Sequence, residues 1–306
     1  MTVGENAIDL QTLLHRCRVE DGESFDLAQH PTRIAQIKDI DKAAGKHLLR
    51  QGVKRLSALQ ELLYANSTWS LLLVFQAMDA GGKDGMIKHV MSGVNPQGVT
   101  VTSFKQPGPV ELSHDYLWRV HLVAPSSGRI GIFNRSHYEE VLVTRVHPEL
   151  LVKQKIPACL RDGAIWEERY RDIRHFEHYL SRQGTVVLKF FLNLSKEEQR
   201  KRFLRRIDLD EKHWKFSISD AREREHWDAY RDAYREAIRN TAQPSAPWFV
   251  IPADRKWMAR LLVMETIIEA LERLKLSVPD PAPDIVRDMA AVRQELEAQA
   301  PKAKHG

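Results

Sequence analysis

The chain has 306 residues and a mass of 35.3 kDa, and 43% of its residues are hydrophobic and 28% charged. This length fits one large domain with a substantial core, or two modest domains. The longest uninterrupted apolar run is Leu71–Phe75, far shorter than the ~20 residues that a membrane-spanning helix needs. The polar start of the chain and its two cysteines lead us to expect a protein of the reducing cytoplasm, with no membrane partner, secretory signal or disulfide framework.

Positive charge is slightly in excess, because 46 Lys and Arg residues face 41 Asp and Glu residues, which gives +5 and a pI near 9.1. The two signs are mixed along most of the chain, so this excess does not indicate a nucleic-acid partner. Residues 199–206, QRKRFLRR, are the exception, with five cations and no acid. This run is either the solvated face of an exposed helix or a contact for a polyanionic ligand.

The hydrophobic pattern predicts one long helix followed by alternating strands and helices. The helix covers Asp41–Tyr64, where leucines recur near helical spacing. Five β-like runs follow, at Ser70–Gln76, Val99–Phe104, Arg129–Phe133, Thr185–Leu192 and Trp248–Ile251. We expect the intervening helices around residues 82–92, 111–122, 137–153, 164–182, 195–206, 220–239 and 254–275.

This alternation predicts an α/β fold with a parallel sheet and right-handed crossovers. The runs at 70–76 and 185–192 are almost entirely apolar, as expected of strands that are buried on both faces. A Pro-rich segment, VPDPAPD, begins after Ser277 and indicates a boundary. We therefore divide the chain into an N-terminal extension (1–45), a catalytic domain (46–278) and a C-terminal tail (279–306), expected to be a frayed helix and a disordered end.

The strongest chemical signal is a Gly-rich loop between the first strand and the next helix. Its residues 77–83, AMDAGGK, have the layout of a P-loop, in which backbone N–H groups and a lysine bind phosphate. Two positions depart from the usual pattern: Ala77 replaces the first Gly, and Asp84 replaces the Ser or Thr that binds magnesium. Asp79 offers a carboxylate in place of the missing hydroxyl. The alternative is an ordinary Gly-rich turn.

A second polar cluster follows the third strand. Asn134, Arg135, Glu139 and Glu140 come directly after it, and the carboxyl ends of parallel strands meet at one edge of a sheet. Arg135 is suited to binding two phosphate oxygens at once through two N–H groups of its guanidinium group. We expect one of the two glutamates to share a metal ion with Asp79, although both could serve only the helix dipole.

Residues 195–240 form a long charged segment between the fourth and fifth strands. The pattern predicts a helix capped by Ser195, with Glu198 closing a capping box, then a loop and a second helix. A helical hairpin in this place is typical of the lid of a phosphotransferase. We call residues 195–240 the lid and expect Arg205, Arg206, Lys212 and Lys215 to reach over the phosphate loop.

Several segments in the same order resemble a family-2 polyphosphate kinase. They are QAMDAGGKDG at 76–85, VNPQG at 94–98, TSFK at 102–105, HDYLWR at 114–119, FNRSHYEE at 133–140, KHWKF at 212–216, WDAY at 227–230, APW at 246–248 and PADRK at 252–256. The similarity extends from about Leu48 to Leu274, which makes it far more specific than any single motif. The segment after Arg135 is similar to the class III subgroup, which phosphorylates both AMP and ADP, except that Glu140 stands where Asp is common.

The resemblance implies a P-loop kinase-like fold of three layers, with a five-stranded parallel sheet, flanking helices and a helical lid. It implies transfer of a phosphoryl group between inorganic polyphosphate and AMP, ADP or ATP, with guanine nucleotides as further candidates. It also implies Mg²⁺, or Mn²⁺ in its place, and a homo-oligomer. Two rival hypotheses remain, an ATP-dependent small-molecule kinase of the same fold and a non-catalytic binder of polyanions such as RNA.

The resulting site prediction has three parts. The catalytic residues are Asp79, Lys83, Arg135 and Glu140, with Asp79 and Glu140 holding the metal ion. The residues expected to bind polyphosphate are Ala80, Gly81, Gly82, Lys83, Asp84, Gly85, Lys88, Lys105, Arg119 and Lys215. The residues expected to bind the nucleotide are Asn134, Arg135, Glu139 and Arg206.

Overall fold

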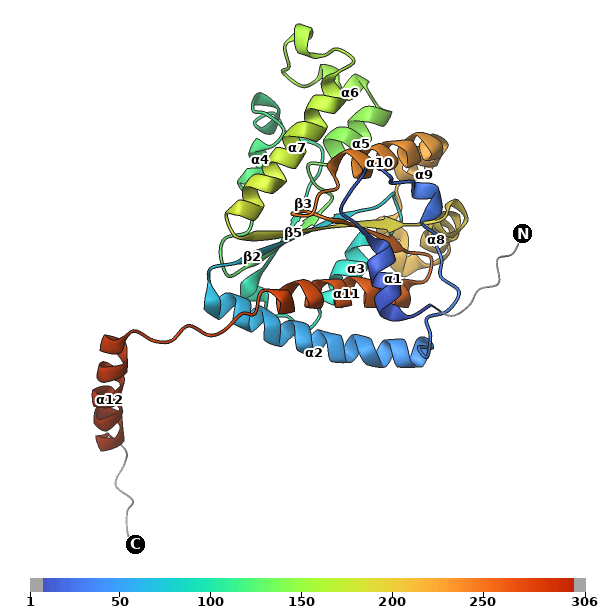
Figure 1. The fold of residues 1–306 in the computed structure, drawn as a ribbon. Coiled ribbons are helices and arrows are strands. Elements are labelled where there is room, and N and C mark those ends of the chain that lie inside the picture. Colours follow the sequence, from blue (N-terminus) through green and yellow to red (C-terminus); the bar gives the residue numbers. More distant parts are fainter. Residues whose placement is uncertain (1–7, 300–306) are drawn as a thin grey trace.

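The computed structural model describes residues 8–299 and contains an α/β fold built on a six-stranded sheet (Figure 1). The strands are β1 (Arg18–Val19), β2 (Ser70–Gln76), β3 (Val99–Ser103), β4 (Ile130–Asn134), β5 (Thr185–Asn193) and β6 (Trp248–Pro252). Their order across the sheet is β1-β6-β5-β2-β4-β3. Five strands run parallel, as the sequence predicts, and β1 adds an antiparallel edge strand that the sequence analysis missed.

The central strand β2 is buried on both faces, which explains its unbroken apolar sequence. Leu71, Leu73 and Phe75 point into one hydrophobic core, and Leu72 and Val74 point into the other. Alternate side chains of a strand point to opposite faces, so the run LLLVF supplies both cores at once. The phosphate loop therefore begins at the end of one of the most constrained strands of the molecule.

Helices cover both faces of the sheet. The helices α1 (Leu10–Cys17), α2 (Lys42–Asn66), α3 (Lys83–Val90) and α11 (Lys256–Arg273) form one layer, and α5 (Glu139–Val146), α7 (Ile165–Arg182) and α10 (Trp227–Thr241) form the other. The shorter helices are α4 (Trp118–His121), α6 (Glu149–Val152) and α9 (Ile218–Arg222). Short 3-10 turns occupy Leu27–Gln29, Pro96–Gly98, Glu111–Ser113, Ala158–Leu160, Asp210–Lys215 and Glu223–His226. None of the helices in the described part of the chain is long and apolar enough to cross a membrane.

Two predicted helices are interrupted. The expected helix at 111–122 is a 3-10 turn followed by the short α4, because the Asp115 carboxylate accepts hydrogen bonds from the backbone of Leu117 and Trp118 and so starts a new helix. The expected helix at 137–153 breaks between α5 and α6 at Pro148, which disfavours the helical conformation of His147 before it.

The N-terminal segment from residue 8 is integrated into the domain. Leu13, Leu14 and Cys17 of α1 are buried in the same hydrophobic core as α11. The strand β1 then pairs with β6, with Arg18 opposite Phe249 and Val19 opposite Trp248. A two-residue strand has no periodicity, so the sequence pattern could not indicate it.

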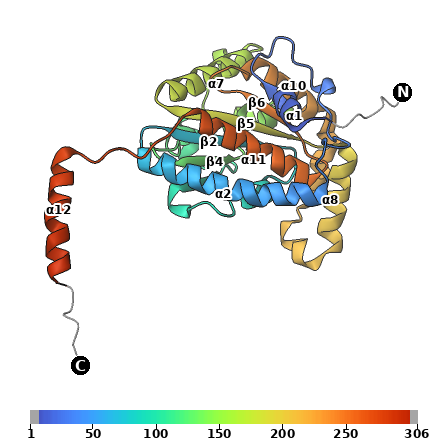
Figure 2. The ribbon, with the colours of Figure 1, turned by 60° about the horizontal axis from the view of Figure 1, so that its bottom comes forward.

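The lid starts with α8 (Lys196–Asp208) and projects from the body beside the sheet (Figure 2). Ser195 caps α8 as predicted, since the Glu198 N–H donates to its hydroxyl at 3.1 Å. The capping box is not closed, however, because the Ser195 N–H donates to Asp254 and the Glu198 carboxylate accepts from Arg202. The last helix, α12 (Pro283–Ala298), stands away from the rest of the protein (Figures 1 and 2).

Candidate functional site

The loop between β2 and α3 has an unusual backbone conformation. Ala80 and Gly82 both have left-handed conformations, with φ of 57° and 95°. A Cβ atom at Gly81 would lie 2.5 Å from the Cβ of Ala77 and 2.7 Å from the carbonyl oxygen of Met78. Position 81 therefore requires glycine, and Ala77 packs against it from the position where a P-loop usually has its first glycine.

Lys83, Asp79 and Arg135 lie together at the end of the sheet. The Lys83 ammonium group donates to the carbonyl oxygen of Ala77 at 2.7 Å, and Nη2 of Arg135 donates to Oδ1 of Asp79 at 3.1 Å. Burial raises the pKa of Asp79 against the opposing effect of both cations. Burial and the charge of Arg135 lower the pKa of Lys83. The predicted cluster is thus formed, and an incoming anion would stabilise both cations.

Arg135 has a strained backbone. Its φ is 63°, a left-handed value that costs a non-glycine residue about 1–2 kcal/mol. The N–H of Arg135 donates to the carbonyl oxygen of Phe75 at 3.1 Å and so continues the β2–β4 pairing by one residue. This conformation turns the side chain from the end of β4 toward the phosphate loop.

Asp84, which stands where a P-loop has Ser or Thr, connects three parts of the site. Its Oδ1 accepts from Nδ2 of Asn134 at 2.8 Å, and Nζ of Lys215 lies 3.7 Å from its Oδ2. Burial opposes ionisation of this carboxyl group, but Asn134, Lys215 and Lys83 together hold its pKa below the ordinary value. Asp84 thereby ties the start of α3 to both β4 and the lid.

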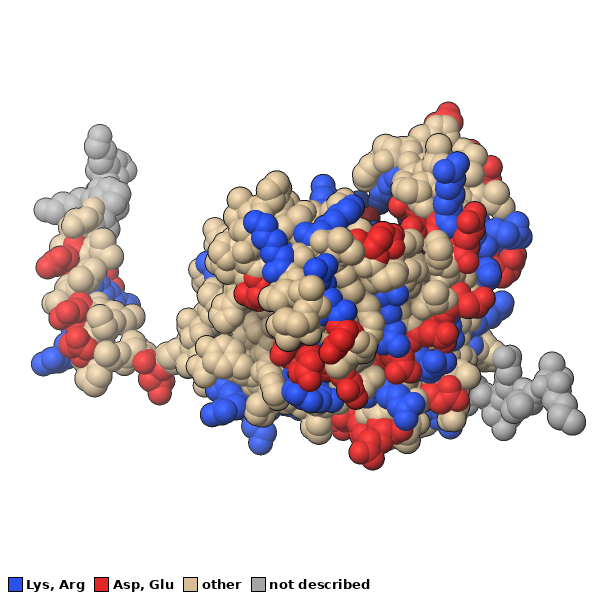
Figure 3. Space-filling model, turned by 90° about the horizontal axis from the view of Figure 1, so that it is seen from above, with Lys and Arg blue, Asp and Glu red and all other residues tan. Residues whose placement is uncertain are grey.

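A cavity of about 630 Å³ lies over the phosphate loop, and we call it the basic cavity. Nine cations and three carboxylates are among its lining residues. They are Asp79, Ala80, Gly81, Gly82, Lys83, Asp84, Gly85, Ser103, Phe104, Lys105, Asn134, Arg135, Arg202, Arg205, Arg206, Lys212, Trp214, Lys215, Asp220 and Lys256. On the face shown in Figure 3, by contrast, Lys and Arg are interspersed with Asp and Glu. Positive charge is thus concentrated in the cavity.

Most residues predicted to bind phosphate line this cavity, and two do not. Lys105 and Lys215 are among its lining residues. Arg206, which was predicted to bind the nucleotide, lines the same cavity and donates to the carbonyl oxygen of Lys215 at 3.3 Å. Lys88 is exposed farther along α3 and is not a lining residue. Arg119 is buried beside the basic cavity in an adjoining cavity, where Nη1 donates to the carbonyl oxygen of Lys105 at 2.9 Å. Arg119 therefore supports the segment after β3 from below.

Arg202 is a site residue that the sequence analysis did not single out. It is buried at the base of the lid, where Nη1 donates to the carbonyl oxygen of Gly81 at 2.8 Å and Nη2 donates to that of Ala253 at 2.6 Å. Gln199 lies one turn earlier and donates to the carbonyl oxygen of Asp79 at 2.9 Å. The sequence contained one indication of this role. Gln199 and Arg202 are three residues apart in QRKRFLRR, which places both on one face of α8.

Lys256, at the start of α11, was also missed. It lines the basic cavity opposite the lid. Partial burial, together with the charges of Arg202 and Arg205, lowers the pKa of Lys256 to about 8. Its side chain therefore loses charge over the pH range in which enzymes are commonly assayed.

Two smaller cavities adjoin the basic cavity at Arg135. The first, of about 370 Å³, shares Asp79, Arg135 and Asp220 with it and adds Glu139 and Glu223 together with Tyr230 and Tyr234. The second, of about 350 Å³, is lined by Arg135 and Glu139 and by apolar groups that include Phe104, Pro107, Leu112, Val143 and Leu150. Burial raises the pKa of Glu139 against the charges of Arg135 and Lys83.

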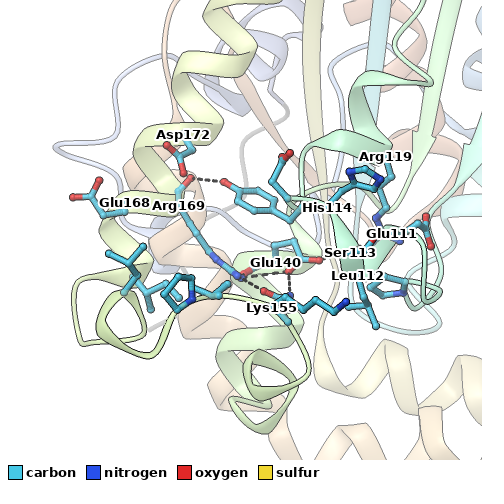
Figure 4. Close-up of a pocket in the computed structure, with 18 of the residues that line it drawn as sticks. Glu111, Leu112, Ser113, His114, Arg119, Glu140, Lys155, Glu168, Arg169 and Asp172 are labelled. Atoms are coloured by element: carbon cyan, nitrogen blue, oxygen red, sulfur yellow. Dashed lines mark hydrogen bonds and ion pairs between the residues drawn. The ribbon is translucent and has the colours of Figure 1, made fainter.

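The predicted partnership of Glu140 with Asp79 is not formed. Glu140 is buried on another side of α5. It lines a cavity of about 820 Å³ (Figure 4) and also the cavity of about 350 Å³, but neither of the two cavities that contain Asp79. Its Oε2 accepts from Nε2 of Gln154 at 2.6 Å and from Nη1 of Arg169 at 3.3 Å. Consecutive helical residues point about 100° apart, so only one of the two glutamates can face the phosphate loop. That residue is Glu139, which lines a cavity with Asp79.

No group of three or more His, Cys, Asp or Glu side chains in residues 8–299 is arranged to hold a metal ion. The carboxylate of Asp79 lies in the phosphate loop and is 23% exposed. Mg²⁺ commonly takes only one or two protein carboxylates and completes its shell with water and substrate phosphates. Asp79 fits that role.

The pair Ser136–His137 is buried and structural. The Ser136 hydroxyl accepts from Nε2 of Gln76 at 3.0 Å, and Nε2 of His137 lies 3.3 Å from Oε1 of Glu177. Glu177 also forms a fully buried ion pair with Lys189, at 2.6 Å. These contacts anchor the segment that follows Arg135 and leave no exposed nucleophile.

Comparisons with known proteins agree with this geometry. The sequence model of the family described as polyphosphate kinase 2 matches residues 39–278. The chain is 50% identical over 280 residues to an ADP-polyphosphate phosphotransferase of Rhodopseudomonas palustris, covering 91% of this chain and 96% of the relative. It is 46% identical over 268 residues to an AMP/ADP-polyphosphate phosphotransferase of Meiothermus ruber, covering 88% and 96%. The crystal structure of polyphosphate kinase 2 from Arthrobacter aurescens superimposes with a TM-score of 0.84 at 40% identity, covering 96% of this chain and all of that one.

Proposed function

This chain belongs to the polyphosphate kinase 2 family, and we propose from this premise that it transfers the terminal phosphoryl group of inorganic polyphosphate to AMP, ADP or both, reversibly. The observation that carries the proposal is the basic cavity over the phosphate loop. Nine cations around one cavity far exceed what a single small anion needs. A polyphosphate chain carries a negative charge on every phosphate unit and can therefore contact many cations at once.

Asp79 and Arg135 lie where the basic cavity meets the smaller cavities, and we infer that the transfer takes place there. The polyphosphate donor would lie in the basic cavity, against the loop and the lid. The acceptor nucleotide would place its phosphate beside Arg135 and the flat aromatic face of its base toward Phe104 and Leu150. Buried apolar walls with a few polar groups are typical of sites for such ligands.

The chemistry requires alignment more than acid–base catalysis. An oxygen of the acceptor phosphate forms a bond to the terminal phosphorus, and the bond from that phosphorus to the bridging oxygen breaks. The shortened polyphosphate keeps the electron pair. Because the attacking oxygen is already anionic, no strong base is needed, and Lys83 and Arg135 offset charge on the phosphoryl group during transfer.

Mg²⁺, when bound, would neutralise phosphate charge, and Asp79 is the residue that we propose to hold it. The salt bridge from Arg135 keeps the Asp79 carboxylate oriented toward the loop. Gln199 fixes the backbone of Asp79 through its hydrogen bond to the carbonyl oxygen. Glu139 replaces Glu140 in our proposal as the second carboxylate near the ion.

The test measures nucleotide products after the protein is mixed with polyphosphate, Mg²⁺ and either AMP or ADP. We expect phosphorylated product from at least one acceptor, with Lys83→Ala reducing turnover by at least ~10³-fold. Lys88→Ala is the matched control, because Lys88 lies on the same helix outside the basic cavity. Activity with ATP as donor and none with polyphosphate would instead support an ATP-dependent kinase. Equal losses in the two variants would refute the site.

A further inference from the structure

The helix α12 has no role in the proposed transfer. It follows a Pro-rich connection, and all of its residues are exposed. The family match ends at residue 278, before α12 begins. Five large apolar side chains on this helix are between 49% and 61% exposed: Ile285, Val286, Met289, Val292 and Leu296. Such a concentration of apolar surface on one isolated helix indicates a binding surface.

The spacing of these residues identifies the kind of partner. Ile285, Met289, Val292 and Leu296 are separated by four, three and four residues, which is the a/d pattern of a helix that packs along another helix. In this pattern Met289 and Leu296 occupy the heptad positions named a, and Ile285 and Val292 occupy those named d. The stripe lies along one side of α12, where these side chains border a shared hollow.

We propose that α12 pairs in parallel with α12 of a second copy of this chain. Charge complementarity supports this partner. Asp288 takes a g position and Arg293 the following e position, so each would face the other across a parallel pair. An antiparallel pair would place Asp288 beside Glu295, where the two negative charges repel.

The charge of α12 disfavours a membrane as the partner. Between Pro283 and Ala298 the helix carries four acids and two arginines. A helix that binds an anionic membrane surface is usually rich in Lys and Arg on its polar face. The acidic balance therefore favours a protein partner over a lipid one.

The pairing is expected to be weak alone and effective in the full chain. A helix of 16 residues is marginally stable by itself in water. Two helices that are tethered to already associated domains meet at a high effective concentration. We therefore expect α12 to strengthen an association of two copies rather than to cause it alone.

Disulfide trapping in the full-length protein tests the proposal. Cys159 is exposed and is first replaced by Ser, whereas Cys17 is buried and its pKa is raised to about 12 by burial, so it stays unreactive. Met289→Cys places a thiol at the a position, where parallel partners face each other. Gln294→Cys, on the outer side of the same helix, is the control. We expect mild oxidation to give mostly covalent dimers with Met289→Cys and at least ~10-fold fewer with Gln294→Cys.

Charge exchange tests the orientation. Asp288→Arg in the Met289→Cys background should lower the dimer yield several-fold, and adding Arg293→Asp should restore it. Phosphotransfer should not change, because these residues lie far along the chain from the site.

Three results would overturn the proposal. One is equal cross-linking of the two cysteine variants. Another is a Met289→Cys thiol that stays protected from maleimide at nanomolar protein, which would mean that α12 folds onto its own chain. The third is flotation of the protein with phosphatidylcholine–phosphatidylglycerol vesicles that is lost when α12 is removed.

Discussion

The buried ion pair between Glu177 of α7 and Lys189 of β5 gives the sharpest prediction about stability. Both side chains are fully inaccessible to solvent. The ammonium group of Lys189 donates to Oε2 of Glu177 at 2.6 Å, to the carbonyl oxygen of Thr241 at 2.8 Å and to the hydroxyl of Tyr138 at 3.1 Å. All three of its donors are therefore used, and no water is needed to satisfy them.

We predict that Lys189→Met lowers the free energy of unfolding by about 3–5 kcal/mol, because it leaves Glu177 as an uncompensated buried carboxylate. For a chain of this size that corresponds to a fall in Tm of roughly 6–10 °C. Thermal unfolding followed by circular dichroism measures it. The double variant Glu177→Gln with Lys189→Met removes both charges and should recover most of the loss.

The pH dependence provides a second readout of the same pair. Burial opposes ionisation of Glu177, but Lys189 and His137 hold its pKa below the ordinary value. Its contribution to stability is therefore present at neutral pH and is lost as the pH falls through that lowered pKa. Without Lys189 the effect of burial dominates, and the pKa of Glu177 rises above the ordinary value. The variant should then lose stability as the pH rises from 5 to 8.

The deficit of Lys189→Met should accordingly be larger at pH 8 than at pH 5. A deficit below about 1 kcal/mol, or one that shrinks as the pH rises, would refute the assignment of an uncompensated charge as the cause.

Three further predictions concern the site. Gly81→Ala should abolish turnover while the protein stays folded in circular dichroism, because its Cβ would lie 2.7 Å from a backbone oxygen. The KM for polyphosphate should rise between pH 7 and pH 9, as Lys256 with its pKa of about 8 loses its charge; Lys256→Arg, which stays charged, should flatten that profile, and an unchanged slope would remove Lys256 from the donor site. Glu139→Gln should lower kcat at least ~10-fold, whereas Glu140→Gln should lower Tm and leave kcat within about twofold. A larger loss of kcat from Glu140→Gln than from Glu139→Gln would instead support Glu140 as the second carboxylate near the metal ion.

Much of the sheet could be predicted from the sequence because its signals are local. The apolar run at 70–76 and the glycines after it identify strand, loop and helix within twenty residues. The distinction between Glu139 and Glu140 could not be predicted. It depends on the rotation of α5 about its axis, which is set by the packing of Val141 and Leu142 against α7 and α10.

The roles of Arg202 and β1 escaped prediction for a related reason. Arg202 contacts Gly81, which lies 121 residues earlier in the sequence, and β1 pairs with a strand about 230 residues later. A sequence pattern reports which face of a helix is apolar, but it does not report which distant backbone oxygen lies beneath a given cation. The basic run was interpreted as either a contact for an anion or a solvated face, but its Arg202 is buried in α8 and hydrogen-bonds to the backbone of the phosphate loop.

The pairing of β1 with β6, and the packing of α2 on α11, bear on how the protein is made. Residues 8–66 leave the ribosome long before their partners at 248–273 are translated. Throughout most of synthesis the apolar side chains of Leu13, Leu14 and Cys17 therefore have no native surface to cover them. Contacts between such distant segments form slowly and leave nascent chains open to chaperones and to aggregation. The two ends of the domain complete each other, so a ribosome that stalls before Trp248 releases a chain that cannot finish its sheet.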